Sequence, residues 1–118
     1  MEIYAKRFLR EVSYTLAVMG KMEDIREIIK ATNIRDINEI GEAKKRIREI
    51  LTTKAEYIRD IARMCETDAK VIISALLQND MATAGRLCEE VVREAKNLVS
   101  KAMDLRRDIG EAEDFGRW

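Results

Sequence analysis

The chain has 118 residues, of which 47% are hydrophobic, so its length and composition suit a single domain with one core. Its 22 Lys and Arg residues balance 22 Asp and Glu residues, which excludes a strong overall field that would attract nucleic acid or an anionic membrane. Proline is absent and aromatic residues make up only 5%. This composition is typical of long helices, so it predicts an all-α protein.

The spacing of apolar residues predicts a first helix from about Glu2 to Ala31. Apolar side chains recur at intervals of three and four, the period of one helix face. They are Phe8, Leu9, Val12, Leu16, Met19, Met22, Ile25, Ile28 and Ile29. Gly20 lies inside this pattern and costs about 1 kcal/mol relative to Ala, so a kink is expected there.

A second helix is predicted to begin after a turn at Thr32 and Asn33. Asp36 can cap its first amides, and Glu39 stands three residues later, as in a capping box. Its apolar face is predicted to contain Ile40, Ala43, Ile47, Leu51, Ile58, Ile61 and Cys65, with Lys44 and Lys54 interrupting it.

The phase of this pattern favours one continuous helix to Asn79. Thr67 or Asp68 offers an alternative start, which would divide the middle helix near residues 66–68. The sequence therefore predicts an antiparallel bundle of three long helices, or four if the middle helix breaks.

Asn79 and Asp80 are predicted to form a corner, in which Asn79 ends one helix and Asp80 caps the next. The following apolar pattern comprises Ala84, Cys88, Val91, Ala95, Leu98, Ala102, Leu105 and Ile109. Gly110 stands where helices commonly stop. Residues 1–110 are thus expected to form one domain, and residues 111–118 a polar tail.

No residue is expected to be catalytic, and no cofactor is expected. The chain has no histidine, which removes the commonest general base and a leading zinc ligand. Cys65 and Cys88 lie within helical patterns and are expected to be reduced and buried.

Carboxylate pairs four residues apart are the remaining candidates for a metal site, because they project from one helix face. The pairs considered are Glu56 with Asp60, Glu90 with Glu94, and Asp104 with Asp108. Neighbouring arginines favour solvated ion pairs instead.

An enzymatic alternative comes from the all-α nucleotide pyrophosphatases of the MazG type, which bind Mg²⁺ through a Glu-Glu-x-x-Glu helix. The segment "EEVVRE" places its third acid, Glu94, one residue too late. Such a slip rotates a helical ligand by about 100°. A metal-dependent phosphoanhydride hydrolase is therefore kept only as the alternative.

The segment from Tyr57 to Asp104 resembles the helical hairpin of PhoU-like domains. The residues that carry the resemblance are "SALLQND", Ala84, "CEEV" and "NLVSKAM". The resemblance implies a dimeric helical regulator, and in some members metal binding through Glu/Asp-x-x-x-Asp motifs. Glu56 to Asp60 fits that motif, whereas Glu90 to Glu94 ends in Glu.

The basic run "KKRIR", from Lys44 to Arg48, wraps around a helix and has no aromatic residues between its charges. A solvated face is expected, and no nucleic-acid partner. No apolar run approaches the roughly 18 residues of a membrane-spanning helix, and the first residues are charged, so a cytoplasmic protein without membrane insertion is expected.

Surplus apolar residues predict self-association. The residues outside the narrowest apolar stripe include Ile73, Leu77, Val92 and Val99, and a long middle helix cannot bury all of its apolar residues alone. Phe115 and Trp118 on the polar tail are expected to anchor a protein partner. The sequence thus predicts a non-enzymatic, homodimeric regulatory or scaffold subunit.

Overall fold

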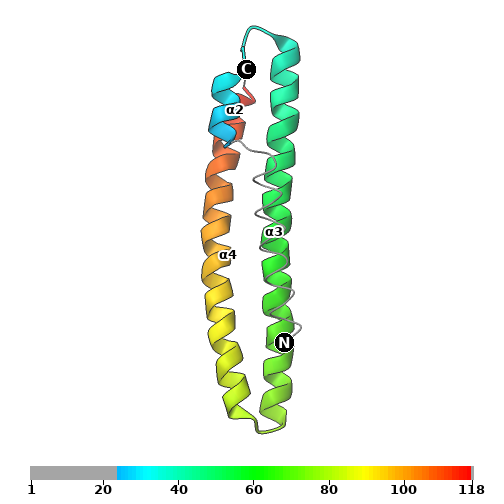
Figure 1. Ribbon diagram of the computed structural model, residues 1–118, viewed down its shortest axis with the longest axis vertical. Coiled ribbons are helices and arrows are strands. Elements are labelled where there is room, and N and C mark those ends of the chain that lie inside the picture. The colour runs from blue at the N-terminus through cyan, green and yellow to red at the C-terminus, as the bar shows by residue number, and fades with distance from the viewer. Residues whose placement is uncertain (1–23, 118) are drawn as a thin grey trace.

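The fold of residues 24–117, the part of the chain described by a computed structural model, is an elongated helical hairpin with a short helix at one end. Helix α2 spans Ile25–Ala31, α3 spans Ile37–Leu77 and α4 spans Met81–Phe115. Figure 1 shows α3 and α4 side by side and antiparallel, with α2 beside the C-terminal end of α4. The described part extends over 66 × 22 × 15 Å and contains no strand, which confirms the all-α prediction.

Helix α2 has seven residues and begins at its own cap. Asp24 is extended, with φ −64° and ψ 146°, and its side chain accepts a hydrogen bond from the backbone N–H of Arg26. An extended N-cap cannot continue a helix that arrives from the preceding residues. The prediction of one helix from Glu2 to Ala31 is therefore wrong, because a new helix begins after Asp24. The part of the predicted helix before Asp24 lies outside the described residues.

Helix α3 runs for 41 residues without a break. Asp36 caps it as predicted, because its Oδ1 accepts from the backbone N–H groups of Asn38 at 2.9 Å and Glu39 at 3.3 Å. At the proposed break, the Thr67 hydroxyl donates to the Arg63 carbonyl one turn earlier and does not cap a new helix. The continuous middle helix is thus confirmed.

The corner between α3 and α4 also agrees with the sequence. Asn79 adopts a left-handed conformation with φ 58°, which Asn tolerates better than most residues. The N–H of Asp80 donates to the Ala75 carbonyl at 2.8 Å, and the Asp80 carboxylate accepts from the N–H of Thr83 at 3.1 Å. Every polar group named here closes a helix end.

Helix α4 continues through Gly110 and ends at Phe115, so the predicted polar tail is wrong for residues 111–115. The reason is tertiary burial: Phe115 is buried in a cluster with Ile25 and Ile28 of α2 and with Ile47 and Ile50 of α3. Burial of a large aromatic side chain outweighs the roughly 1 kcal/mol that glycine costs inside a helix.

The line of contact between α3 and α4, here called the seam, follows a spacing of three and four residues on both helices, as in a coiled coil. Its buried members on α3 are Ala43, Ile47, Ile50, Tyr57, Ile61, Met64, Asp68 and Ala75. Those on α4 are Ala84, Leu87, Glu94, Asp108 and Phe115.

The seam on α4 differs from the predicted apolar stripe at three positions. Leu87, Glu94 and Asp108 are buried, whereas the predicted neighbours Cys88, Ala95 and Ile109 are exposed. The prediction followed apolar residues alone, but the helix turns charged side chains toward α3.

Replacement of Asp80 by Ala should lower the urea midpoint of unfolding, because the Thr83 N–H loses its acceptor. Asp80→Ser should recover most of the loss, since a serine hydroxyl can accept the same bond. Equal midpoints for the Ala and Ser variants would contradict the capping role.

The cap should also respond to pH. Hydrogen bonds from the side chain and then the backbone N–H of Thr83 lower the pKa of Asp80. The cap's contribution is therefore complete above the ordinary pKa of Asp and is lost as the pH falls through the lowered value. The stability difference between wild type and Asp80→Ala, measured by urea unfolding, should shrink in that acidic range.

Candidate functional site

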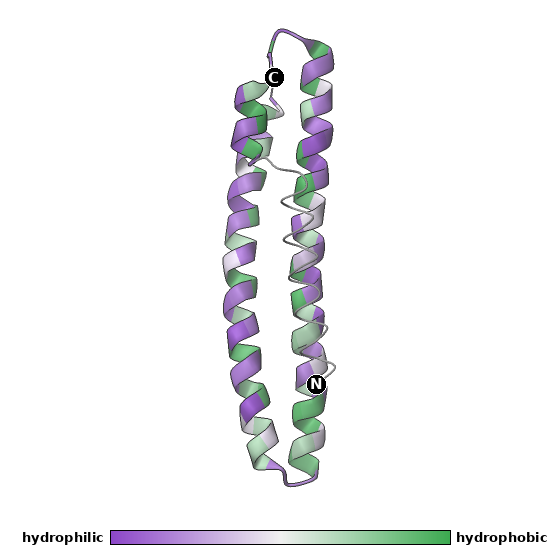
Figure 2. Ribbon diagram, viewed as in Figure 1, coloured by the Kyte–Doolittle hydropathy of each residue, from purple (hydrophilic) through white to green (hydrophobic). Residues whose placement is uncertain are grey.

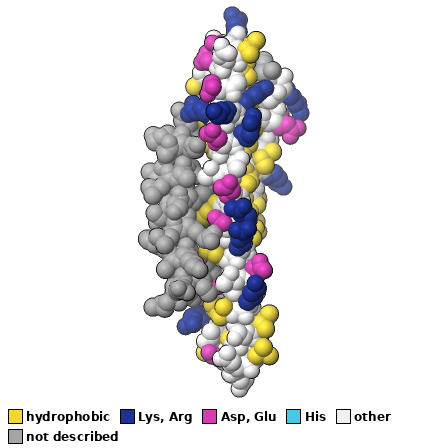
Figure 3. All heavy atoms as spheres, turned by 90° about the vertical axis from the view of Figure 1, so that its right-hand side faces the viewer, with side chains coloured by type: hydrophobic (Ala, Val, Ile, Leu, Met, Phe, Trp, Pro, Cys, Tyr) yellow, Lys and Arg dark blue, Asp and Glu magenta, His cyan; other side chains and the backbone are white. Residues whose placement is uncertain are grey.

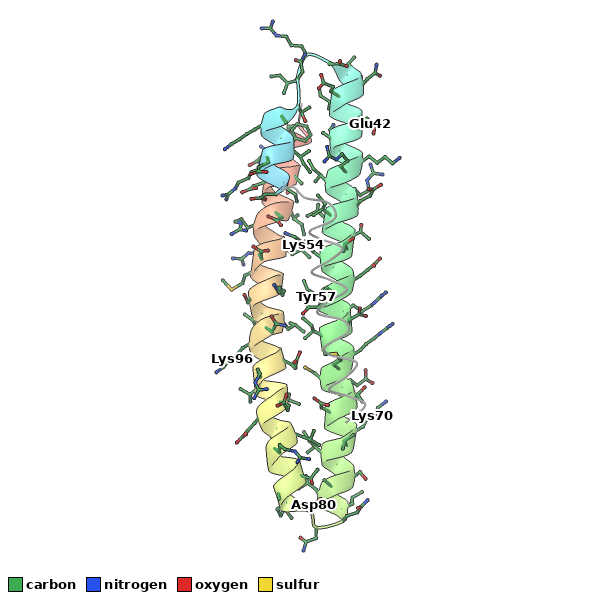
Figure 4. The ribbon with its side chains drawn as sticks, viewed as in Figure 1. Glu42, Lys54, Tyr57, Lys70, Asp80 and Lys96 are labelled. Atoms are coloured by element: carbon green, nitrogen blue, oxygen red, sulfur yellow. The ribbon has the colours of Figure 1, made fainter. Side chains whose placement is uncertain are left out.

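An ion-pair cluster crosses the seam near the α2 end of the hairpin. Lys54 Nζ on α3 binds Asp108 Oδ2 on α4, and it lies 3.5 Å from Asp104 Oδ2. The side chain of Lys54 is 15% exposed and that of Asp108 only 1%. Figure 4 shows Lys54, and Tyr57 one turn further on, on the side of α3 that faces α4. Lys54 therefore interrupts the apolar face because it is a structural partner of α4.

Helix α2 is attached to α4 through a second ion pair. Arg26 Nε lies 2.5 Å from Glu111 Oε1. The hydrogen bond with Glu111, and then its charge, raise the pKa of Arg26. This pair and the Phe115 cluster hold α2 against the end of the hairpin.

Asp24, Asp108 and Glu111 form the only group of three or more metal-ligand types found in residues 24–117, with ligand atoms within 4.8 Å of one another. Two cations already occupy it, because Lys54 binds Asp108 and Arg26 binds Glu111. A metal ion would have to displace both. The group is best explained as a structural ion-pair cluster.

Of the carboxylates considered from the sequence, Asp108 joins this group and the others do not. On α3, Glu56 is exposed, and Asp60 is half-buried with its Oδ1 3.9 Å from Arg59 Nε. On α4, Glu90 accepts a hydrogen bond from Arg93 at 2.8 Å, as the ion-pair interpretation expects, and Glu94 is buried in the seam. These residues are not gathered into a single ligand set of three or more.

The residues considered for an interface lie in very different places. Ile73 is 59% exposed and Leu77 is 84% exposed, both near the corner end of α3. Phe115 is 3% exposed, so its expected role as a tail anchor is wrong. Trp118 lies outside the described residues.

A set of apolar residues on one side of the hairpin, here called the open face, was predicted only in part: Val92 and Val99 were expected to be surplus, but Leu76 and Cys88 were expected in the core. Most of its residues stand one position after a seam residue in the sequence. All of them are exposed except Ile72, which is half-buried. They are Ile72 and Leu76 on α3, and Met81, Cys88, Val92 and Val99 on α4. The expectation of a buried Cys88 is therefore wrong within the single chain, and Cys65 is only half-buried.

These residues share one side of the hairpin because of its geometry. In each helix, the residue that follows a seam position points about 100° away from the seam. Because the two helices are antiparallel and face each other, these residues of α3 and α4 point toward the same side of the hairpin. Glu111, which binds α2, precedes seam position Ala112 by one residue, so α2 lies on the opposite side. Figure 2 shows that the corner end of α3 is strongly hydrophobic.

The charged surface of α3 carries no single-sign patch. In the basic run, Ile47 is buried while Lys45, Arg46 and Arg48 are exposed on different sides of the helix. Figure 3 shows Lys and Arg interspersed with Asp and Glu along this side of the molecule, with hydrophobic side chains toward the corner end. A solvated face agrees with this arrangement.

Comparisons with known proteins find no match to this chain among family models, curated proteins or solved structures. Among the residues that the structure describes, no helix combines the length and apolar character needed to cross a membrane.

Replacement of Lys54 by Met should lower the free energy of unfolding by about 3–5 kcal/mol, because Asp108 would remain buried without its main cation. Changing Asp108 to Asn in the same chain removes that buried charge. The double variant should therefore be more stable than Lys54→Met alone, as measured by urea unfolding. Additive losses from the two changes would show that the pair is not coupled.

Proposed function

We propose that this chain acts by association, as a homo-oligomeric helical subunit with a regulatory or scaffold role and without catalytic activity. The observation that supports this proposal is the open face. Monomeric proteins seldom expose apolar patches beyond a few hundred Å², and larger patches commonly mark interaction sites. Val92 and Val99 are both more than half exposed, and they lie two helical turns apart on one line.

The shape of the hairpin supports the same function. Two helices of 41 and 35 residues present a long, regular surface, which suits packing against other helices. The polar groups of the corner are used to close helix ends, and the charged groups near α2 bind one another. These polar groups are structural, which leaves the apolar surface as the strongest candidate for function.

Self-association should be visible in sedimentation, with a dimer at micromolar concentration. Leu77→Glu or Ile73→Glu should shift the chain toward monomer, because each places a charge beside the open face. Ile37→Glu is the matched control: Ile37 is 85% exposed but lies at the other end of α3. A well-folded wild-type monomer at high concentration would contradict homo-oligomerisation.

The alternative function is a metal-dependent enzyme acting on a nucleotide or phosphate ester, and the PhoU-like resemblance also allows metal binding. A calorimetric titration with Mn²⁺ or Mg²⁺ distinguishes these from a purely associative protein. We expect no stoichiometric binding. Tight binding that disappears in a Glu56→Gln and Asp60→Asn double variant, but persists in a Glu66→Gln control, would favour the alternative.

A further inference from the structure

We propose that the open face is covered by a second copy of this chain, with α4 packed antiparallel against α4 of the second copy and α3 against its α3. This inference rests on the proposed function and names the partner and the geometry of its interface. Two hairpins stacked in this way form a four-helix arrangement related by a two-fold axis.

The size of the hairpin is sufficient for such an interface. The described part measures 66 Å by 22 Å across its broad side. A standard interface buries roughly 800 Å² on each partner. The corner half of the hairpin, together with flanking residues, can therefore supply a standard interface without requiring the whole length.

Charges on the same side of the hairpin favour the antiparallel arrangement. Toward the α2 end, Lys44, Arg48 and Arg106 also follow seam positions by one residue, so they share the side of the open face, where Glu113 is the acid at the same kind of position. A parallel dimer would bring these cations together, three from each copy. An antiparallel dimer that overlaps at the corner halves places the cations of the two copies at opposite ends of the assembly, so they do not face one another.

A charge pair at the edge of the open face selects the register. Glu89 and Lys96 are exposed, follow Cys88 and Ala95 by one residue, and are seven residues apart. Neither forms an ion pair with any residue in the described range 24–117. Figure 4 shows Lys96 on the side of α4 that points away from α3.

Antiparallel α4 helices can shift past one another in steps of one heptad. One register places Glu89 against Glu89 of the second copy, and another places Lys96 against Lys96. The register between them pairs Glu89 with Lys96 twice, once on each side of the axis. This register puts the axis near Arg93 and places Val99 against Cys88 of the second copy.

Charge reversal tests the register. Glu89→Lys and Lys96→Glu should each weaken dimerisation on the order of tenfold in sedimentation, because both symmetric pairs become repulsive. The chain that carries both changes should regain wild-type affinity. Circular dichroism checks that each variant stays helical.

Cross-linking provides an independent readout in a Cys65→Ser background. With Val99→Cys, the introduced thiol should form an intermolecular disulfide with native Cys88 under mild oxidation, since a disulfide needs Cα atoms within about 7 Å. Ile109→Cys is the control, because Ile109 is exposed on the same side but lies about ten residues out of register with Cys88.

The outcomes separate the two proposals. A dimer that ignores charge reversal, or cross-links equally through Ile109→Cys, overturns this geometry but leaves self-association intact. A wild-type chain that sediments as a monomer overturns both. Restoration by the double charge reversal, together with selective cross-linking of Val99→Cys, supports the interface described here.

Discussion

The ion pair between Lys54 and Asp108 determines how α3 and α4 are rotated against each other. A buried charge needs a partner, since removal from water costs several kcal/mol for each ion. Lys54 and Asp108 meet only if both occupy the seam. Once they do, the regular spacing of three and four residues brings Glu94 and Asp68 into the seam as well.

This rotation has a direct consequence for the surface. Apolar residues that would fill a conventional core are turned by one position, about 100°, away from the contact between the helices. Cys88 and Ile109, which the apolar pattern places in the core, thus become exposed on the same side of the hairpin as Val99. Buried ion pairs often contribute little net stability, and their best-attested use is to specify register and partner choice. Here the pair specifies which apolar residues remain exposed.

The two ends of the hairpin are stabilised by different means. At the corner, hydrogen bonds close the helix ends around Asn79 and Asp80. At the other end, α2 contributes Ile25 and Ile28 to a cluster with Phe115. The middle depends on the seam alone within the described hairpin. A partner that covers the open face would add packing along the length where the hairpin has least of its own, which links stability to association.

The sequence by itself determined the helical class, the continuous middle helix and the corner, because these depend on local chemistry. Helix propensity, the phase of the apolar pattern and the caps at Asp36 and Asp80 all act within a few residues. The tertiary structure decided which side of each helix is buried, because a charged residue is acceptable in a core only when its partner is present, and Lys54 and Asp108 are far apart in sequence. It likewise decided that α4 continues past Gly110, because the burial of Phe115 against α2 outweighs a local stop signal. The full extent of the open face could not be predicted for the same reason, because Leu76 and Cys88 are exposed only through the rotation that the distant charges impose on the two helices.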